Sequence, residues 1–241
     1  MAGESLQATL DRQLGGRERV RVLDAGCGAH GRVALPAQAH IVGLDISADQ
    51  LAKNQDVHEK VLGDIQTYEL PPQSFDVVIC WELLEHVPHP ERALALFARA
   101  LKDDGVLVLA APNVLSIKGL VTKFTPYRFH RWYYQRMYKI AHPPIFPTHL
   151  KLSMTPRAIF EFAARSGLVV EFYNIEESFM LVDARRKWHV VGWRWSLIRN
   201  ALRGLSLGRM QPELTDWQMV LRRAPAAAPG AAPGATAGAT T

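Results

Sequence analysis

The sequence has few of the features that mark secreted or membrane-spanning proteins. It contains two cysteines, Cys27 and Cys80, which are too few for a disulfide framework, so we expect a reducing, cytoplasmic environment. No uncharged apolar run reaches the ~18–20 residues that a membrane-spanning helix needs. The first residues lack a basic start followed by an apolar stretch, so we expect no signal peptide. These absences exclude an integral membrane protein and a disulfide-stapled scaffold.

Acidic residues are absent from two long stretches, 105–160 and 184–212. The whole chain of 241 residues has 28 Lys and Arg against 23 Asp and Glu, so the excess of +5 is mild and its distribution is uneven. Aromatic residues are interleaved with the basic ones in both stretches. The basic residues are Lys118, Lys123, Arg128, Arg131, Arg136, Lys139, Lys151 and Arg157 in the first stretch, and Arg185, Arg186, Lys187, Arg194, Arg199, Arg203 and Arg209 in the second.

Short aliphatic runs alternate with helical periodicity through most of the chain. The runs cover 19–24, 40–45, 75–80, 105–110, 168–175 and 216–222, and such runs are typical of strands that are buried on both faces. Helical spacing predicts helices at 91–102 and after Thr155, where Ser153 or Thr155 can cap the first turn and Gly167 can end the helix. The pattern predicts a doubly wound α/β sheet.

The ends of the chain differ from this central region. Leu6, Leu10 and Leu14 are spaced for one short amphipathic helix within 1–19. Residues 224–241 consist of Ala, Pro, Gly and Thr, a composition that predicts a disordered tail. We therefore expect one main domain at 20–223, with insertions at about 114–150 and 178–214.

The most specific local motif follows the first predicted strand and reads Val22-Leu23-Asp24-Ala25-Gly26-Cys27-Gly28-Ala29-His30-Gly31. Glycines after a buried strand permit a tight turn and close approach of the backbone to a ligand. Asp45 lies 21 residues after Asp24, at the end of the next strand, where a carboxylate can accept hydrogen bonds from ribose. The chain lacks a Walker-type motif, and Asp24 would repel a pyrophosphate but suits a cationic amino-acid ligand.

Four motifs together resemble the class I S-adenosylmethionine-dependent methyltransferases. They are Val22–Gly28, Gly43–Ser47, Gly63–Ile65 and Phe75–Val87, and the resemblance is to the branch that includes ubiquinone-biosynthetic O-methyltransferases. It covers 20–113 well and 148–176 loosely. One departure concerns the third glycine, which in the family often stands at the position of His30 and here stands at Gly31. Residues 31–39 are also short for the family's first helix.

The resemblance implies a Rossmann-like sheet of about seven strands with an antiparallel last strand and helical insertions after the fifth and sixth strands. It also implies S-adenosyl-L-methionine as cofactor. The implied cofactor-binding residues are Asp24, Gly26, Cys27 and Gly28 at the methionine end, Asp45 at the ribose, Ile46 on the adenine, Asp64 and Ile65 at the adenine amino group, and the backbone of Cys80 and Trp81, which completes the methionine site. The alternative role for Asp64 is to cap a turn.

Several absences narrow the chemistry. Cys-Trp-Glu-Leu-Leu-Glu-His follows the fourth strand, where N-methylating enzymes carry an [Asp/Asn]-Pro-Pro motif and cytosine C5 enzymes a Pro-Cys pair. No carboxylate lies between Asp104 and Glu161, where a catechol-type magnesium site would need one. Metal-independent methylation of a hydroxyl or similar nucleophile is the best remaining interpretation. A protein that binds the cofactor without turnover is an alternative from a different class.

The general base cannot be assigned from the sequence. The candidates are His86 after the fourth strand and His130, His142 and His149 in the first acid-free stretch. Each can deprotonate a hydroxyl near neutral pH, and a packing role for His86 is the main alternative. Glu82 and Glu85 are three residues apart, and we expect them on a solvated helical face.

Both acid-free stretches leave the carboxyl ends of strands, so we expect a cationic, aromatic lid over the acceptor. Trp188, Val191, Trp195, Ile198, Leu202 and Leu205 fit one face of a single helix. Three ligands fit such a lid: an anionic membrane surface with a lipid-linked or saccharide-linked acceptor, a soluble anionic small molecule, or, third, RNA. The alternative is that the helix packs on the domain and the arginines are solvated.

Overall fold

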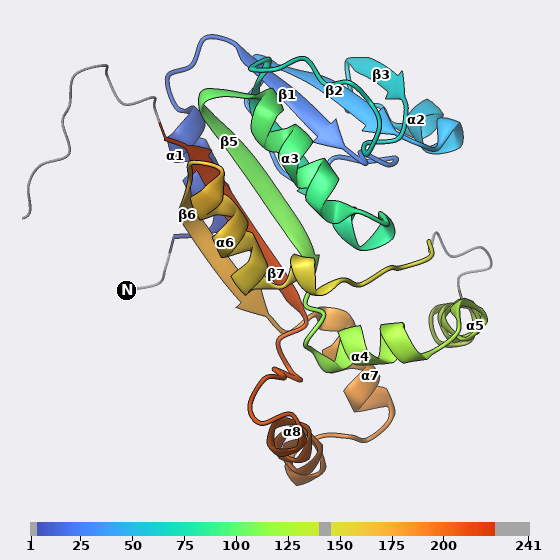
Figure 1. Cartoon of the computed structure of the whole chain (residues 1–241). Helices are drawn as coiled ribbons and strands as arrows, with labels where there is room; N and C mark the ends of the chain where they lie inside the picture. The colour runs from blue at the N-terminus through green and yellow to red at the C-terminus, as the bar shows by residue number, and fades with distance from the viewer. Residues whose placement is uncertain (1–3, 140–145, 225–241) are drawn as a thin grey trace, which may run out of the picture.

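The structure is a computed structural model that describes residues 4–139 and 146–224. These residues form a seven-stranded sheet with the order β3-β2-β1-β4-β5-β7-β6 (Figure 1). The strands are β1 (Val20–Ala25), β2 (Ala39–Asp45), β3 (Glu59–Leu62), β4 (Phe75–Trp81), β5 (Leu101–Pro112), β6 (Leu168–Glu176) and β7 (Asp216–Arg223). Strands β1 to β5 pair in parallel, and β7 runs antiparallel between β5 and β6. The predicted Rossmann-like sheet with an antiparallel last strand is confirmed.

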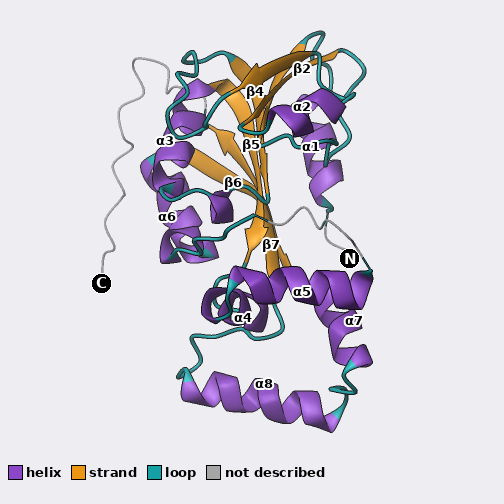
Figure 2. Ribbon diagram, turned by 90° about the vertical axis from the view of Figure 1, so that its right-hand side faces the viewer, coloured by secondary structure: helices purple, strands orange, loops and turns teal. Residues whose placement is uncertain are grey.

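Helices cover both faces of the sheet (Figure 2). On one face, α3 (Pro90–Ala100) and α6 (Pro156–Arg165) contribute Phe97 and Ile159 to a core cluster with Leu23 and Leu107. On the other face, α1 (Leu6–Leu14) buries its three leucines in a second cluster that includes Val22 and Val106. Along β1, Leu23 and Ala25 belong to the first cluster and Val20 and Val22 to the second, because successive side chains of a strand point to opposite faces. The predicted N-terminal helix is confirmed.

One boundary is as predicted and another differs in the two helices that were predicted from 91 and after Thr155. Helix α6 begins after Thr155, whose hydroxyl accepts a hydrogen bond from the Ala158 N–H, so Thr155 and not Ser153 is the cap. The helix predicted at 91–102 ends at Ala100, and the prediction is wrong for the last two residues. Leu101 instead begins β5, because its fully buried side chain pairs with Phe75 in the sheet.

The connection from β1 to β2 contains no helix within the described residues 26–38, in line with its shortness and Pro36. Helix α2 (Ala48–Lys53) follows β2 and leads to β3. Two short 3₁₀ helices, η1 (Leu84–His86) and η2 (Leu152–Met154), lie after β4 and before α6. The cofactor loop predicted from the sequence is therefore a stand-alone turn that other elements must hold.

Four further helices lie beyond the ends of β5 and β6 (Figures 1 and 2). Helices α4 (Ile117–Phe124) and α5 (Tyr127–Tyr138) follow β5, and α7 (Phe179–Lys187) and α8 (Trp193–Leu205) follow β6. The helical insertions expected after the fifth and sixth strands are thus present. None of the helices in the described residues is both long and apolar enough to cross a bilayer.

The single apolar face predicted from Trp188 to Leu205 is wrong. The predicted helix is interrupted between α7 and α8, where His189 has a φ of 54° and Gly192 a φ of 57°. Trp188 and Val191 therefore lie outside α8. Within α8, all of whose residues are described, Trp195 is the one buried residue, while Leu205 is 85% exposed. The 225–241 part of the predicted tail lies outside the described residues.

Candidate functional site

The glycine loop after β1 is bound tightly to its neighbours. The Gly26 N–H donates to the Leu44 carbonyl at 2.7 Å, which ties the loop to the end of β2. Gly26 has a φ of +69°, and a Cβ at this position would lie 2.8 Å from the Leu83 Cδ1 atom. A larger residue would therefore be strained in its backbone and would also collide with the turn that follows β4. This contact joins the glycine loop directly to the segment that carries His86.

Asp45 orders the same loop from the end of β2. Its Oδ2 accepts a hydrogen bond from the Gly28 N–H at 2.9 Å, and its Oδ1 accepts one from the Ser47 N–H at 2.8 Å. Each carboxylate oxygen has a further lone pair, so both can still accept hydrogen bonds from a diol. The adjacent Ile46 side chain is 72% exposed. The end of β2 thus presents acceptor oxygens beside an uncovered apolar surface, the combination that a ribose and its base require.

Asn54 is a part of the loop that the sequence did not reveal. Its fully buried side chain donates through Nδ2 to the Gly28 carbonyl at 2.9 Å and to the Cys27 carbonyl at 3.3 Å. Its Oδ1 accepts from the Asp56 N–H at 2.8 Å. Asn54 caps the carboxyl end of α2 and holds a turn that no following helix supports. No spacing rule marks an asparagine 26 residues beyond a glycine.

Asp24 is buried at the end of β1, and its side chain is 6% exposed. Burial raises the pKa of this carboxyl to about 7; the charges of Asp45 and Asp56 act in the same direction and that of Arg32 opposes them. A carboxyl whose ionisation is this unfavourable gains from a cation placed beside it. Burial also raises the pKa of Cys27 to about 12, so this thiol is not a nucleophile at neutral pH.

The two residues predicted beside the adenine amino group differ in accessibility. Asp64 accepts a hydrogen bond from the Gln66 N–H at 2.9 Å, and its carbonyl accepts from the Thr67 and Tyr68 N–H groups, so it does cap a turn. One of its carboxylate oxygens keeps acceptor capacity, so both roles are compatible. Ile65 is 4% exposed and packs in the core, so only its backbone can reach a ligand.

The end of β4 lies beside the end of β1, with Cys80 opposite Ala25. Cys80 is fully buried, and burial raises the pKa of its thiol well above the ordinary value. Trp81 is half-buried against the α1 side of the core. The backbone at this strand end adjoins the end of β1, from which the glycine loop leaves, and the buried Cys80 thiol is not a nucleophile at neutral pH.

Glu85 contradicts the expectation of a solvated face. It is 3% exposed, and its Oε2 atom is buried with no hydrogen-bond partner among the described residues. Burial raises the pKa of this carboxyl to about 8, with a further contribution from the charge of Glu82, whose own side chain stays exposed. The backbone of Glu85 is held as well, because the His149 N–H donates to the Glu85 carbonyl at 2.7 Å. A local sequence pattern cannot show this contact, since His149 lies about 60 residues further along the chain.

His86 and His149 lie in the same region, whereas His130 lies elsewhere. The His86 Nδ1 atom is 2.9 Å from the Pro147 carbonyl, and its ring packs edge-on against Phe146 with 5.8 Å between ring centroids. Burial lowers the pKa of His86. His149 exposes its ring, and His130 on α5 contacts the Thr125 hydroxyl at 2.8 Å. His142 lies outside the described residues.

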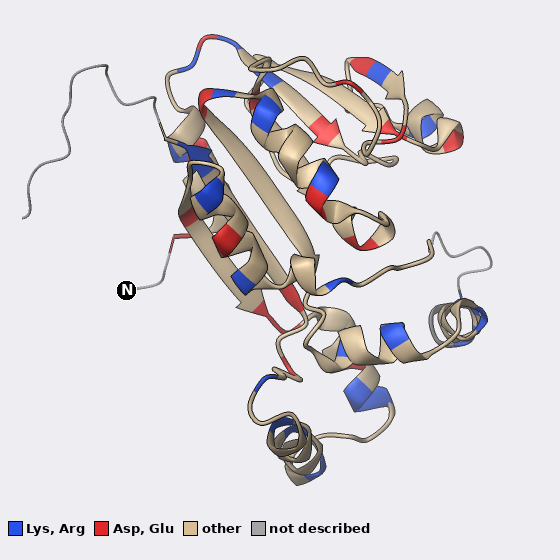
Figure 3. Ribbon diagram, in the orientation of Figure 1, with Lys and Arg blue, Asp and Glu red and all other residues tan. Residues whose placement is uncertain are grey.

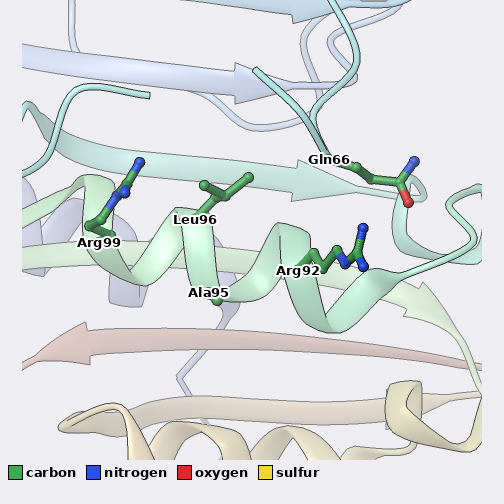
Figure 4. A pocket seen from close by; sticks show the side chains of 5 residues that line it. All are labelled: Gln66, Arg92, Ala95, Leu96 and Arg99. Carbon is green, nitrogen blue, oxygen red and sulfur yellow. The ribbon is translucent and has the colours of Figure 1, made fainter. Parts of the chain in front are cut away.

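Two hollows border this region. An open groove of about 370 Å³ lies between α3 and the turn after Asp64, lined by Gln66, Arg92, Ala95, Leu96 and Arg99 (Figure 4). A smaller hollow of about 160 Å³ lies at the insertions and is lined by Val114, Leu115, Leu120, Lys123, Phe124, Leu150, Leu152 and Met210. The first adjoins the predicted adenine site, and the second joins both insertions. No group of three or more His, Cys, Asp or Glu residues within the described ranges is placed to hold a metal ion.

Comparison with known proteins identifies a family to which the chain belongs. A family model described as "Methyltransferase domain" matches residues 2–170. A ubiquinone biosynthesis O-methyltransferase from Idiomarina loihiensis is 32% identical over 182 residues, which are 68% of this chain and 69% of that protein. One from Neisseria meningitidis is 30% identical over 133 residues, 46% of this chain and 56% of that protein, so the chain spans little more than half of such a relative.

A solved structure agrees with these comparisons at the level of the fold. The crystal structure of a sarcosine dimethylglycine methyltransferase from Galdieria sulphuraria, described there as putative, superposes with a TM-score of 0.55. The match covers 89% of this chain and 81% of that one, with 16% sequence identity. At this identity the likeness supports the sheet and its topology and does not identify a substrate.

Proposed function

The chain belongs to the class I S-adenosylmethionine-dependent methyltransferases, and we propose that it transfers the methyl group of this cofactor to a hydroxyl of a small acceptor with an apolar tail. The observation that carries the proposal is the contact between the glycine loop and the turn after β4, where Leu83 fills the space beside Gly26. This contact places the cofactor loop and His86 on adjoining turns at the same edge of the sheet.

The residues at the ends of β1 and β2 fit the cofactor by their chemistry. Asp45 would accept hydrogen bonds from the ribose hydroxyls, and the exposed Ile46 would pack on the adenine. Asp24 would face the cationic methionine end, which offsets the cost of ionising a buried carboxyl. Gly28 has open space at its Cβ position, so a ligand can approach its backbone. The cofactor supplies an activated methyl group, which leaves alignment and proton removal to the protein.

His86 is the base that the geometry favours. The Pro147 carbonyl can only accept a hydrogen bond, so the Nδ1 atom of His86 carries the proton and donates it. The Nε2 atom is then the nitrogen that can accept a proton from a hydroxyl. The lowered pKa keeps the ring neutral, and therefore basic, at pH 7. Among the described residues, no comparable contact fixes the His149 ring, so we assign it a minor role.

The acceptor is inferred from the hollow at the insertions. Seven of its eight lining residues are apolar, and the eighth, Lys123, places a cation beside them. Phe124 is 72% exposed and Leu152 is 69% exposed, so an apolar ligand would cover surface that otherwise faces water. The relatives' name, ubiquinone biosynthesis O-methyltransferase, is consistent with an acceptor of this kind. A lipid-linked acceptor is therefore preferred over a soluble saccharide or RNA.

The test is methyl transfer from S-adenosylmethionine with a radiolabelled methyl group. Purified protein is incubated with lipid, polysaccharide, RNA and small-molecule fractions of a lysate of the source organism, and Asp45→Ala serves as the blank. We expect wild-type-specific label in the lipid fraction. Label confined to RNA or polysaccharide would contradict the acceptor class. No label in any fraction, with cofactor binding intact, would favour binding without turnover.

The sequence prediction that the step needs no metal ion remains part of the proposal. It is tested in the same assay by adding EDTA and then magnesium. Unchanged transfer with EDTA is the expected result, and transfer that is lost with EDTA and restored by magnesium would contradict it.

A further inference from the structure

Helix α8 stands apart from the rest of the fold. It lies on the far side of α4 and α7 from the sheet (Figures 1 and 2). Trp195 is its one buried residue, and it packs under the Arg185 guanidinium, which lies 4.4 Å from the centre of the indole ring. The helix is therefore attached by one side, and its opposite side faces solvent.

That opposite side is apolar. Trp193 is 73% exposed, Leu197 is 64% exposed and Leu205 is 85% exposed, and Leu207, just after the helix, is 85% exposed. At ~100° per residue, Trp193, Leu197 and Leu205 lie within about 120° of arc, which also includes Arg194. Trp193 and Leu197 lie about 160° from Trp195, and Leu205 lies about 80° from it. We call these four residues, Trp193, Leu197, Leu205 and Leu207, the outer stripe. A set of large, exposed apolar side chains along one side of a helix is typical of a surface that meets a partner.

Basic residues are interspersed along α8 (Figure 3). Arg194 lies over the Trp193 ring at 5.7 Å, and Arg209 follows the helix. Two acidic residues that flank the second insertion form salt bridges. Glu213 pairs with Arg203, and Glu177 pairs with Arg185 at 2.5 Å. From Phe179 to Gln211 the chain has one acidic residue, Asp183, against seven Lys and Arg. The partner that this charge complements is anionic.

We infer that the outer stripe of α8 docks on an anionic lipid bilayer, lying flat in the headgroup layer. This inference rests on the proposed lipid-linked acceptor. With 13 residues, α8 is about 20 Å long and too short to cross a bilayer. Its tryptophan, leucines and flanking arginines are the residues that an interfacial helix uses. Leucines do not stack on bases, so the stripe fits a bilayer better than RNA.

Docking at α8 would also serve the proposed acceptor hollow. Met210 follows α8 by five residues and lines that hollow together with Leu120 and Phe124 of α4. The hollow is thus lined mainly by the first insertion, and Met210 connects it to the segment that carries the outer stripe. A bilayer held against α8 would bring an apolar tail to the hollow without its passage through water.

The test is flotation of the full chain with vesicles at low salt. One set of vesicles contains phosphatidylglycerol in phosphatidylcholine, and the other is phosphatidylcholine alone. We expect flotation with the anionic set, and about a tenfold lower bound fraction for Leu197→Glu/Leu205→Glu. Val169→Glu is the matched control, because Val169 is a 46% exposed apolar residue near the start of β6, at the opposite end of the sheet from α8.

Binding of S-adenosylmethionine, measured by calorimetry for each variant, separates the outcomes. Wild type that binds the cofactor but does not float overturns the bilayer inference alone, whereas wild type that does not bind the cofactor overturns the proposed function. Equal flotation of the double variant, or equal flotation with both vesicle sets, also overturns the inference. So does a stripe-dependent dimer in vesicle-free solution or stripe-dependent retention of an RNA oligonucleotide, since either identifies a different partner.

Discussion

Two corners of the sheet edge differ in how they are built. At the ends of β1 and β2, backbone groups, Asp45 and Asn54 form a closed set of hydrogen bonds around a loop that needs glycine. At the ends of β5 and β6, four helices carry exposed aromatic and aliphatic side chains among arginines. The first corner is held together by its own hydrogen bonds, while the second exposes many more large apolar side chains.

The difference follows from what each corner must recognise. A fixed cofactor rewards a preformed cradle, because each hydrogen bond is then made without ordering the loop anew. An acceptor with an apolar tail needs area and access, which exposed side chains on short helices provide. The variants below separate these two roles, in order from the largest expected effect to the smallest.

Asp45→Ala should weaken S-adenosylmethionine binding by about 100-fold or more, because it removes the acceptors for the ribose and also the anchors of the Gly28 and Ser47 N–H groups. Titration calorimetry measures this. Asp49→Ala is the control, since it removes a nearby exposed carboxylate from α2. Affinity within twofold of wild type for Asp45→Ala would show that the nucleoside binds elsewhere.

His86→Gln should lower kcat for methyl transfer by about 100-fold and leave cofactor affinity unchanged, as loss of a general base does. His149→Gln, the matched variant, should have a much smaller effect. Since the pKa of His86 is lowered, wild-type kcat should stay level at neutral pH and fall only below about pH 6.5. A larger loss for His149→Gln would transfer the role of base to His149.

Glu85→Gln should change how stability depends on pH. The pKa of Glu85 is raised to about 8 in the folded chain, so between about pH 4.5 and 8 the unfolded chain loses this proton first. The free energy of unfolding should then fall as the pH rises, by at most about 1.4 kcal/mol per unit from this group. Asp24 contributes with the same sign, so Glu85→Gln should reduce the slope without abolishing it. Urea unfolding at pH 5, 6.5 and 8 measures this, with exposed Glu82→Gln as control.

Asp24 should make cofactor affinity depend on pH. Its pKa of about 7 means that a cationic ligand must displace a proton at lower pH. Affinity should therefore rise by up to about tenfold per unit between pH 5 and 7 and then level off. Asp24→Asn should bind more weakly, with no such rise. A pH-independent wild type would place Asp24 away from the positive charge.

The site residues at the ends of β1 and β2 could be predicted from the sequence better than those at the insertions. Asp24, Gly26 and Asp45 lie at short, fixed spacings around strand ends, and those spacings are set by local chain geometry. The role of Asn54 was not predicted, because it depends on how the glycine loop is held when no helix follows it. Glu85 was assigned to solvent because the charges near its buried carboxyl, Lys118 and Asp216, come from segments that are distant in sequence.

The insertions were predicted by composition but not by geometry. The two stretches that lack acidic residues and are rich in aromatic ones predicted insertions at the ends of β5 and β6, and the structure has helices there. The prediction of one apolar helical face from Trp188 to Leu205 was wrong, because the periodicity of apolar residues cannot detect the interruption of the helix at His189 and Gly192. It placed Trp195 and Leu205 together, whereas the structure buries one and exposes the other.

A crystal structure with bound S-adenosylhomocysteine, the product form of the cofactor, would test the account most directly. The account predicts ribose hydroxyls within hydrogen-bond distance of Asp45, adenine on Ile46, and the sulfur atom between the glycine loop and the turn that carries His86. A nucleoside in the groove between Arg92 and Arg99, with Asp45 still bound only to Gly28 and Ser47, would contradict it.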